Sequence, residues 1–184
     1  TNLCEAEVSI ITSISRDHME YLGEDLKQIA FEKASIIKQS GTVFAHIPDN
    51  EIFNVVNSLA QSRDATVYRL NSEFKVAQIE SKNGLQTFDF SDEKEELTGL
   101  ELPLTGQFQA KNAGLAIAAC LKLIENSSEN EIRKGLRTVK WEGRLEVVSD
   151  NPTVVLDSAH NEASVRNMAS ELRKSIRIEG LCPG

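Results

Sequence analysis

The chain has 184 residues, of which 40% are hydrophobic, and it carries a formal net charge of −8 at pH 7. This length allows one large or two smaller globular domains. The acidic balance and the lack of any Lys/Arg cluster argue against a general nucleic-acid-binding surface, because phosphate binding requires concentrated positive charge. Three widely spaced cysteines and the lack of a long apolar run predict a cytoplasmic protein without a disulfide framework, a zinc site or a membrane span.

The first predicted element is a buried strand over residues 8–14, where β-branched and apolar residues dominate. Asp17 and His18 follow its carboxyl end, which is where ligands bind in open α/β sheets. A neutral His18 imidazole can ligate a cation, and oxygen ligands nearby would complete a shell suited to Mg²⁺. The alternative is a loop histidine that is hydrogen-bonded to a backbone carbonyl.

A helix is predicted from Asp25 onwards, and Lys33 falls on its apolar side. The apolar positions at helical spacing are Leu26, Ile29, Ala30, Ala34 and Ile37. Burial disfavours a charged ammonium group and favours the neutral amine, which can attack carbon dioxide as a nucleophile. The alternative is a lysine whose charged end reaches solvent or pairs with a carboxylate.

Alternating strand and helix patterns then indicate an α/β organisation. A strand, a helix and a strand are predicted over residues 42–47, 50–63 and 65–70. Residues 74–104 are rich in β patterns, and the Asn83-Gly84 dipeptide between two of them is typical of a hairpin. We therefore expect an antiparallel segment appended to a parallel sheet. The charged residues 92–96 are interpreted as a solvated turn.

Residues 109–124 are apolar nearly all round and predict a deeply buried helix, with Asn112 in or near its first turn. An Asn carboxamide can match the donor and acceptor edges of a purine, although it can also cap a helix. An amphipathic helix over residues 129–139 precedes Arg144. Its planar, permanently charged guanidinium group suits phosphate, and the alternative is a surface salt bridge, for example to Glu146.

A further strand over residues 153–156 opens a new α/β unit, and Asp157 stands at its carboxyl end. A carboxylate in that place can hold ribose hydroxyls. Asn161 can cap the helix that follows, because its side-chain oxygen can accept a hydrogen bond from a free amide of the first turn.

Four motifs, in this order, resemble folylpolyglutamate and dihydrofolate synthases, which belong to the Mur ligase superfamily. The motifs are Asp17-His18 with residues 29–38, then residues 106–113, 141–146 and 157–161. The resemblance implies a partial Mur-ligase-like central ATPase domain over residues 1–142, with a parallel sheet and a small antiparallel segment. It implies that residues 143–184 are a linker and the truncated start of a Rossmann-like C-terminal domain.

The same resemblance implies roles for single residues. Lys33 would be carbamoylated and would help to organise Mg²⁺ and phosphate, with His18 as a metal ligand. Asn112 would contact the adenine and Arg144 the phosphates. From the C-terminal domain, Asp157 and His160 would face the ATP.

For the intact enzyme, the resemblance implies an ATP-dependent amide ligase. ATP would phosphorylate a carboxylate of the folate, and the amine of L-glutamate would attack the acyl phosphate. The implied partners are therefore folate or dihydropteroate and L-glutamate, with no nucleic acid and no membrane. We expect a monomer at full length.

The chain also departs from the family pattern. The departures are Phe108, Ser158 and Glu162, where His, Gly and Pro are usual, together with Ser15-Arg16 and Ser35. No Gly-x-x-x-x-Gly-Lys-Ser/Thr phosphate loop occurs in the 184 residues. We therefore expect a fragment of a longer synthase that is inactive alone. The alternatives are a peptidoglycan-building Mur ligase and a non-catalytic scaffold that has lost the phosphate loop.

Overall fold

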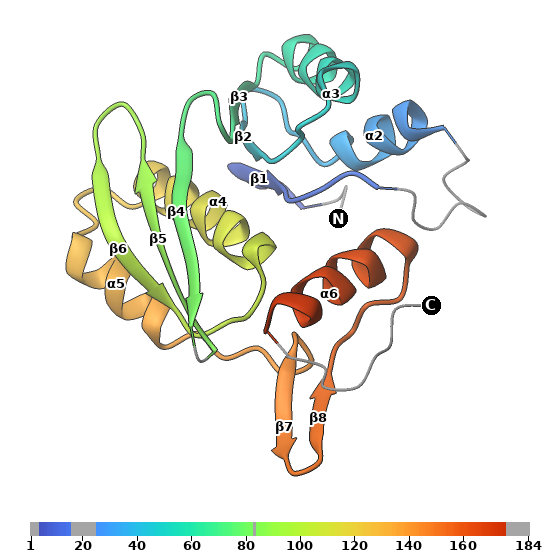
Figure 1. Ribbon diagram of the computed structural model, residues 1–184. Helices are drawn as coiled ribbons and strands as arrows, with labels where there is room; N and C mark the ends of the chain where they lie inside the picture. Colours follow the sequence, from blue (N-terminus) through green and yellow to red (C-terminus); the bar gives the residue numbers. More distant parts are fainter. Residues whose placement is uncertain (1–3, 16–24, 83, 176–184) are drawn as a thin grey trace.

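The computed structural model describes residues 4–15, 25–82 and 84–175 (Figure 1). The strands are β1 (Val8–Ile11), β2 (Thr42–Ala45), β3 (Thr66–Arg69), β4 (Lys75–Lys82), β5 (Leu85–Ser91), β6 (Glu96–Leu102), β7 (Glu146–Asp150) and β8 (Thr153–Leu156). The helices are α2 (Leu26–Ala34), α3 (Asn50–Ser62), α4 (Gln107–Leu123), α5 (Glu129–Arg137) and α6 (Glu162–Ser175). Within these ranges, no helix is long and apolar enough to span a membrane.

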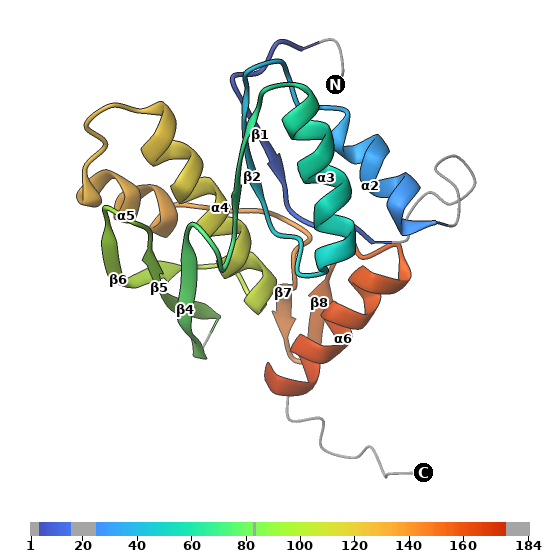
Figure 2. The same cartoon turned by 90° about the horizontal axis from the view of Figure 1, so that it is seen from above.

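The first sheet is parallel, with the strand order β1-β2-β3. Side chains alternate between its two faces along β2, as the two-residue period of a strand requires. Val43 and Ala45 share a core cluster with α2 and α3, whereas Phe44 belongs to the cluster of α4. Helices α2 and α3 lie side by side over one face of the sheet (Figure 2). The predicted α/β organisation is confirmed.

The second sheet is antiparallel, with the strand order β4-β5-β6. The chain passes from β4 to β5 at the predicted hairpin, where Gly84 has a φ of 77°. The predicted turn joins β5 to β6, and Asp92 closes it. Its Oδ1 atom accepts hydrogen bonds from the N–H groups of Lys94 and Glu95, each at 2.8 Å.

Helix α4 packs against both sheets. Its apolar side chains share one core cluster with Phe44 of β2 and Phe90 of β5. Gly114 allows the helix to approach β4 closely, because a Cβ atom built on this glycine would lie 2.2 Å from Cγ2 of Val76. The expected deep burial is confirmed for Ala113, Leu115 and the residues 117–119, but it is wrong at Ala116 and Cys120, which are exposed. It is also wrong at the end of the helix, where the side chain of Leu123 is 49% exposed.

A buried amide fixes the start of α4. Gln86 of β5 is fully buried, and its Nε2 atom donates to the carbonyl oxygens of Leu104 and Gly106. Gly106, the residue before the helix, has a φ of 105°, a conformation that residues other than glycine rarely adopt. The loop that leads into α4 is therefore held by a side chain of the second sheet.

The last described segment consists of an antiparallel pair of strands, β7 and β8, followed by α6. The strand predicted over residues 153–156 is confirmed as β8, but its partner β7 was not predicted. Several apolar side chains of this segment remain in contact with solvent. Val147, Leu156 and Val165 are 55%, 49% and 43% exposed. The apolar side chains of β7, β8 and α6 are thus only partly covered by the described residues.

Several predicted elements are wrong at their ends, because a run of apolar residues does not show where a turn begins. The helix predicted over residues 129–139 ends at Arg137. The strand predicted over residues 8–14 ends at Ile11, and the strand predicted over 42–47 ends at Ala45. Helix α2 ends at Ala34, so Ile37 lies beyond the helix although its side chain is buried.

We predict opposite effects for two Gly→Ala substitutions in helices. Gly114→Ala should lower the free energy of unfolding by about 1–3 kcal/mol, because the added methyl group overlaps Val76 and moves α4 away from β4. Gly135→Ala in α5, where a Cβ atom would meet nothing within 4 Å, should raise it by about 0.5–1 kcal/mol. Urea unfolding followed by circular dichroism measures both, and equal effects of the two substitutions would contradict this account of α4 packing.

Candidate functional site

A cleft of about 720 Å³ lies between the carboxyl ends of β1 and β2, the start of α4, and the segment that runs from residue 141 into α6. Figure 1 shows α6 facing β1 and the start of α4 across this region. The predicted residues that line the cleft are Asn112, Arg144, Asp157 and His160. The sequence separates these residues by up to 48 positions, and the fold brings them to one cavity.

Asn112 lies in the second turn of α4, with its side chain half-buried. Its Nδ2 atom donates to Oε1 of Gln109, and the two atoms are 3.5 Å apart. The N-cap of the helix is Gly106, and no side chain caps it. The capping alternative for Asn112 is therefore wrong, and the carboxamide faces the cleft with one weak intrahelical contact.

Arg144 is exposed at the mouth of the cleft. The expected alternative was a salt bridge to Glu146, but Oε2 of Glu146 accepts a hydrogen bond from the N–H group of Gly143 at 2.8 Å. Within the described residues, no carboxylate forms an ion pair with Arg144. The salt-bridge alternative is wrong, and the guanidinium group is available to a ligand.

Asp157 ties the two strands of the C-terminal segment together. Its Oδ2 atom accepts from the N–H group of Leu145 at 2.9 Å, and its Oδ1 atom accepts from that of Ala159 at 2.7 Å. Each carboxylate oxygen has two acceptor positions, so each retains one after these bonds. The carboxylate is consequently fixed in direction and can still accept from a ligand hydroxyl.

His160 and Asn161 form the entry to α6. Nδ1 of His160 lies 2.9 Å from the carbonyl oxygen of Ser158. A carbonyl can only accept, so we assign the proton to Nδ1, which leaves Nε2 as the acceptor in the neutral ring. Asn161 Oδ1 accepts from the N–H group of Ser164 at 2.9 Å, which confirms its predicted capping role.

Lys33 reaches from α2 to the end of β1. Its side chain is half-buried, and Nζ donates to the carbonyl oxygen of Ser13 across 3.5 Å. Ser13 lines the cleft, so the Lys33 amine lies beside the cleft, although Lys33 is not among the lining residues.

Asp17 and the predicted metal ligand His18 lie outside the described residues. Within the described ranges, no group of three or more His, Cys, Asp or Glu side chains is arranged to hold a metal ion.

Sequence reasoning missed His46, a half-buried residue of the cleft. Its N–H group donates to the carbonyl oxygen of Ile11 at 2.9 Å, which holds it beside β1. Burial and the nearby charge of Lys111 lower the pKa of His46, and a hydrogen bond with the backbone of Thr12 opposes this shift in part. The sequence did contain a signal for this residue, because His46 directly follows a buried parallel strand. The predicted strand was two residues too long, however, and it included His46.

The parallel sheet with helices on both faces, the appended antiparallel sheet and the cleft at the carboxyl ends of the strands define an α/β protein with a cleft at one edge of its parallel sheet. The sequence profile of the Mur ligase middle domain matches residues 1–120. The chain therefore belongs to the Mur ligase family.

Similar proteins identify the branch that the chain resembles. It is 33% identical over 178 residues to the dihydrofolate synthase/folylpolyglutamate synthase of Bacillus subtilis, an alignment that covers 95% of this chain and 41% of that protein. It is 30% identical over 181 residues to the folylpolyglutamate synthase of Lacticaseibacillus casei, covering 95% of this chain and 42% of that protein. The resemblance predicted from the four motifs is confirmed.

Solved structures agree with this placement. An FPGS–AMPPCP–folate complex superposes with a TM-score of 0.90 at 28% identity and covers 96% of this chain and 44% of that one. The folylpolyglutamate synthase of Mycobacterium tuberculosis complexed with ADP superposes with a TM-score of 0.85 at 35% identity. The superposition covers 94% of this chain and 40% of that one. The chain thus spans about two fifths of the length of the relatives that it matches.

We predict that His46 makes the fold less stable in mild acid. The folded state disfavours the charged imidazole, so the unfolded chain takes up the proton first as the pH falls through the ordinary value of 6.5. The free energy of unfolding should therefore fall between about pH 7.5 and 5.5, and His46→Gln should reduce that fall. Urea unfolding at several pH values measures this, and equal slopes in the two proteins would refute it.

Proposed function

We propose that the whole protein is an ATP-dependent amide ligase that adds L-glutamate to a folate or to dihydropteroate. One observation carries the proposal. The cleft gathers an amide, a guanidinium group that pairs with no carboxylate of the described residues, a fixed carboxylate and an imidazole from separate segments of the chain. This set of donors and acceptors suits a nucleotide, and the similar proteins bear the names of folylpolyglutamate and dihydrofolate synthases.

In this proposal, each cleft residue contacts one part of the ATP. The Asn112 carboxamide pairs with the purine edge, and Arg144 holds the phosphates through its planar fork. Asp157 accepts from ribose hydroxyls with the acceptor positions that its two amide bonds leave. His160 contacts the nucleotide from the start of α6. Residues 1–142 then form the ATPase part and residues 143–184 the linker and the start of the next domain.

The reaction has two steps. A folate carboxylate oxygen attacks the γ-phosphorus of ATP, which forms an acyl phosphate and releases ADP. The amine of L-glutamate then attacks the acyl carbon, the amide bond forms, and phosphate leaves with loss of one amine proton. The cleft residues orient the nucleotide, and orientation of the reacting groups supplies much of the rate. Mg²⁺, when bound, would offset charge on the transferred phosphoryl group.

We further propose that Lys33 carries a carbamate in the active enzyme and that His18 is a ligand of the metal. The half-buried amine beside the Ser13 carbonyl supports the first of these roles, because it lies next to the cleft wall. A carbamate would convert this cation into an anion at the edge of the cleft. The whole enzyme is proposed to be a cytoplasmic monomer.

A substrate screen of the full-length protein tests the proposed reaction. The protein is incubated with ATP, Mg²⁺, an amino acid and one of three substrates: dihydropteroate, tetrahydrofolate or a UDP-muramoyl peptide. Mass spectrometry then measures the masses of the products. We expect a pterin or folate product heavier by one glutamyl unit, with ADP and phosphate in equal amounts. A product from the muramoyl peptide alone would assign the protein to the peptidoglycan branch. No ATP-dependent product from any substrate would favour a non-catalytic scaffold.

We predict that Arg144 contributes to nucleotide binding in the full-length enzyme. Arg144→Gln should lower kcat/KM for ATP by about 10-fold to 100-fold, because a charge-assisted contact is lost. Arg144→Lys should keep part of the rate. Arg166→Gln is the matched control, since this arginine is exposed on α6 and pairs with Glu162 at 2.6 Å. Equal kinetics for Arg144→Gln and the control would remove Arg144 from the site.

We predict that Lys33→Ala leaves the full-length enzyme nearly inactive, with a loss of about 100-fold or more, because the carbamate cannot form. A short carboxylic acid such as acetate should restore part of the rate by placing an anion in the vacated space. Removing bicarbonate should lower the activity of the unmodified enzyme. Lys27→Ala is the control, because this lysine is exposed on the same helix and pairs only at the surface with Glu51. Full activity of Lys33→Ala would disprove the carbamate.

A further inference from the structure

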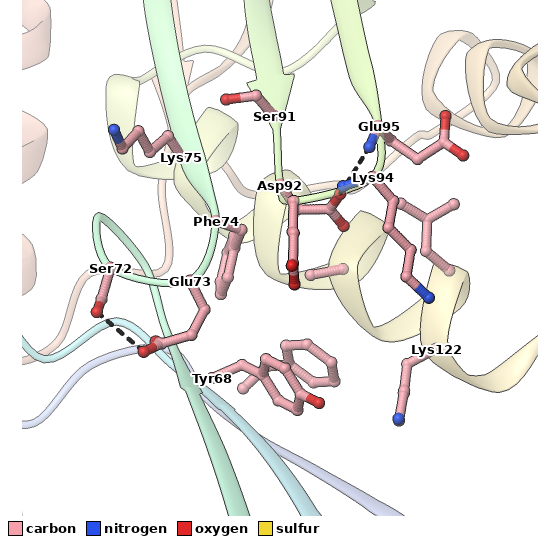
Figure 3. A pocket seen from close by; sticks show the side chains of 14 residues that line it. Tyr68, Ser72, Glu73, Phe74, Lys75, Ser91, Asp92, Lys94, Glu95 and Lys122 are labelled. Carbon is pink, nitrogen blue, oxygen red and sulfur yellow. Dashed lines mark hydrogen bonds between the residues drawn. The ribbon is translucent and has the colours of Figure 1, made fainter.

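A second cavity, of about 590 Å³, lies at the opposite end of α4 from the cleft. Its walls are the loop between β3 and β4, the turn between β5 and β6, and the last turns of α4 (Figure 3). Asn112 near the start of α4 lines the cleft, and Lys122 near its end lines this cavity. Within the described part of the chain, the two cavities share no lining residue. Its volume is in the range that holds small organic ligands.

The floor of the cavity is aromatic. Phe44 and Tyr68 stack with ring centroids 5.1 Å apart, and Phe74 meets Phe44 edge-on at 6.0 Å. Phe44 and Phe74 are 3% and 2% exposed, so their positions are fixed by the core, and half-buried Tyr68 presents its ring to the cavity. A rigid floor of this kind favours a flat aromatic or large apolar group.

Three lysines line the cavity, and two of them, Lys94 and Lys122, supply positive charge on one side of the rim. Figure 3 shows Lys94 and Lys122 on the same side of the opening, and Nζ of Lys122 lies 5.9 Å from the Tyr68 ring centroid. Neither lysine forms an ion pair with a carboxylate of the described residues. Both ammonium groups are therefore available to an anion that rests on the aromatic floor.

Four carboxylates line the same rim. Asp92 and Glu73 are held by hydrogen bonds with the backbone, whereas Glu93 is exposed on the turn. Asp92 accepts from the two turn amides, and Glu73 accepts from the N–H group of Arg69 at 2.6 Å and from the Ser72 hydroxyl at 2.9 Å. The Glu95 side chain points away from the aromatic floor in Figure 3. The acidic residues of the turn thus set the rim in place, and their charge disfavours a ligand with more than one negative charge.

We propose that this cavity binds a small monocarboxylic acid that carries an aromatic or large apolar group. The ring of the ligand rests on the half-buried ring of Tyr68, which the core residues Phe44 and Phe74 hold in place. The carboxylate of the ligand accepts from the ammonium groups of Lys94 and Lys122. The site is independent of the proposed ligase reaction, because it lies at the other end of α4 and uses other residues.

Calorimetric titration of the full-length protein with 3-phenylpropionate tests the proposal. We expect saturable binding with a dissociation constant on the order of 1 mM. Three further probes separate the contributions. 2-Phenylethylamine has the ring with the opposite charge, inorganic phosphate has negative charge without a ring, and acetate has the carboxylate without a ring. Each should bind at least about fivefold more weakly than 3-phenylpropionate.

Variants locate the bound acid. Lys94→Gln and Lys122→Gln should each weaken 3-phenylpropionate binding by about threefold to tenfold, whereas Lys140→Gln, at an exposed lysine outside the cavity, should not. Thermal unfolding of each variant checks that the fold is intact. No saturable binding, equal binding of the acid and the amine, or unchanged affinity in both rim variants would overturn the proposal.

Discussion

The described structure depends on the burial of α4 between two sheets. The helix shares a core with the parallel sheet through Phe44 and with the antiparallel sheet through Phe90. Gly114 removes the side chain that would otherwise hold the helix away from Val76 of β4. This close contact fixes the position of both helix ends. One end carries Asn112 into the cleft, and the other carries Lys122 to the rim of the second cavity.

The other side of the cleft is built by hydrogen bonds more than by apolar packing. Asp157 connects the amides of Leu145 and Ala159, and it thereby fixes where β7 begins and where β8 ends. Arg144 precedes Leu145 and is positioned by this connection. The apolar side chains of β7, β8 and α6 stay partly exposed, so this side has few packing contacts among the described residues. A ligand that bridges α4 and Asp157 would hold the two sides together.

The sequence predicted most of the architecture because the strands and helices carry clear periodic patterns. The strand over residues 153–156, the start of the amphipathic helix at residue 129 and the hairpin at Gly84 were predicted correctly. β7 was missed because its alternation is short and two of its valines face solvent. His46 was missed because the end of β2 depends on where the chain turns towards α3, which apolar runs do not show.

The candidate site was predicted through motifs, and its geometry came only from the fold. The sequence offered Asn112 and Arg144 as ligand residues, with helix capping and a salt bridge as alternatives. The structure removes both alternatives, because Gly106 occupies the cap and Glu146 bonds the Gly143 amide. Spacing along the chain could not decide these points, since each depends on the partner that a side chain meets after folding.

A structure of the full-length protein with a non-hydrolysable ATP analogue tests the central claim most directly. The account predicts that the analogue occupies the cleft between the start of α4 and α6. The base should contact Asn112, the phosphates Arg144, and the ribose Asp157. An analogue bound in another cavity, or bound in the cleft without contact to Asn112 and Arg144, would contradict the account.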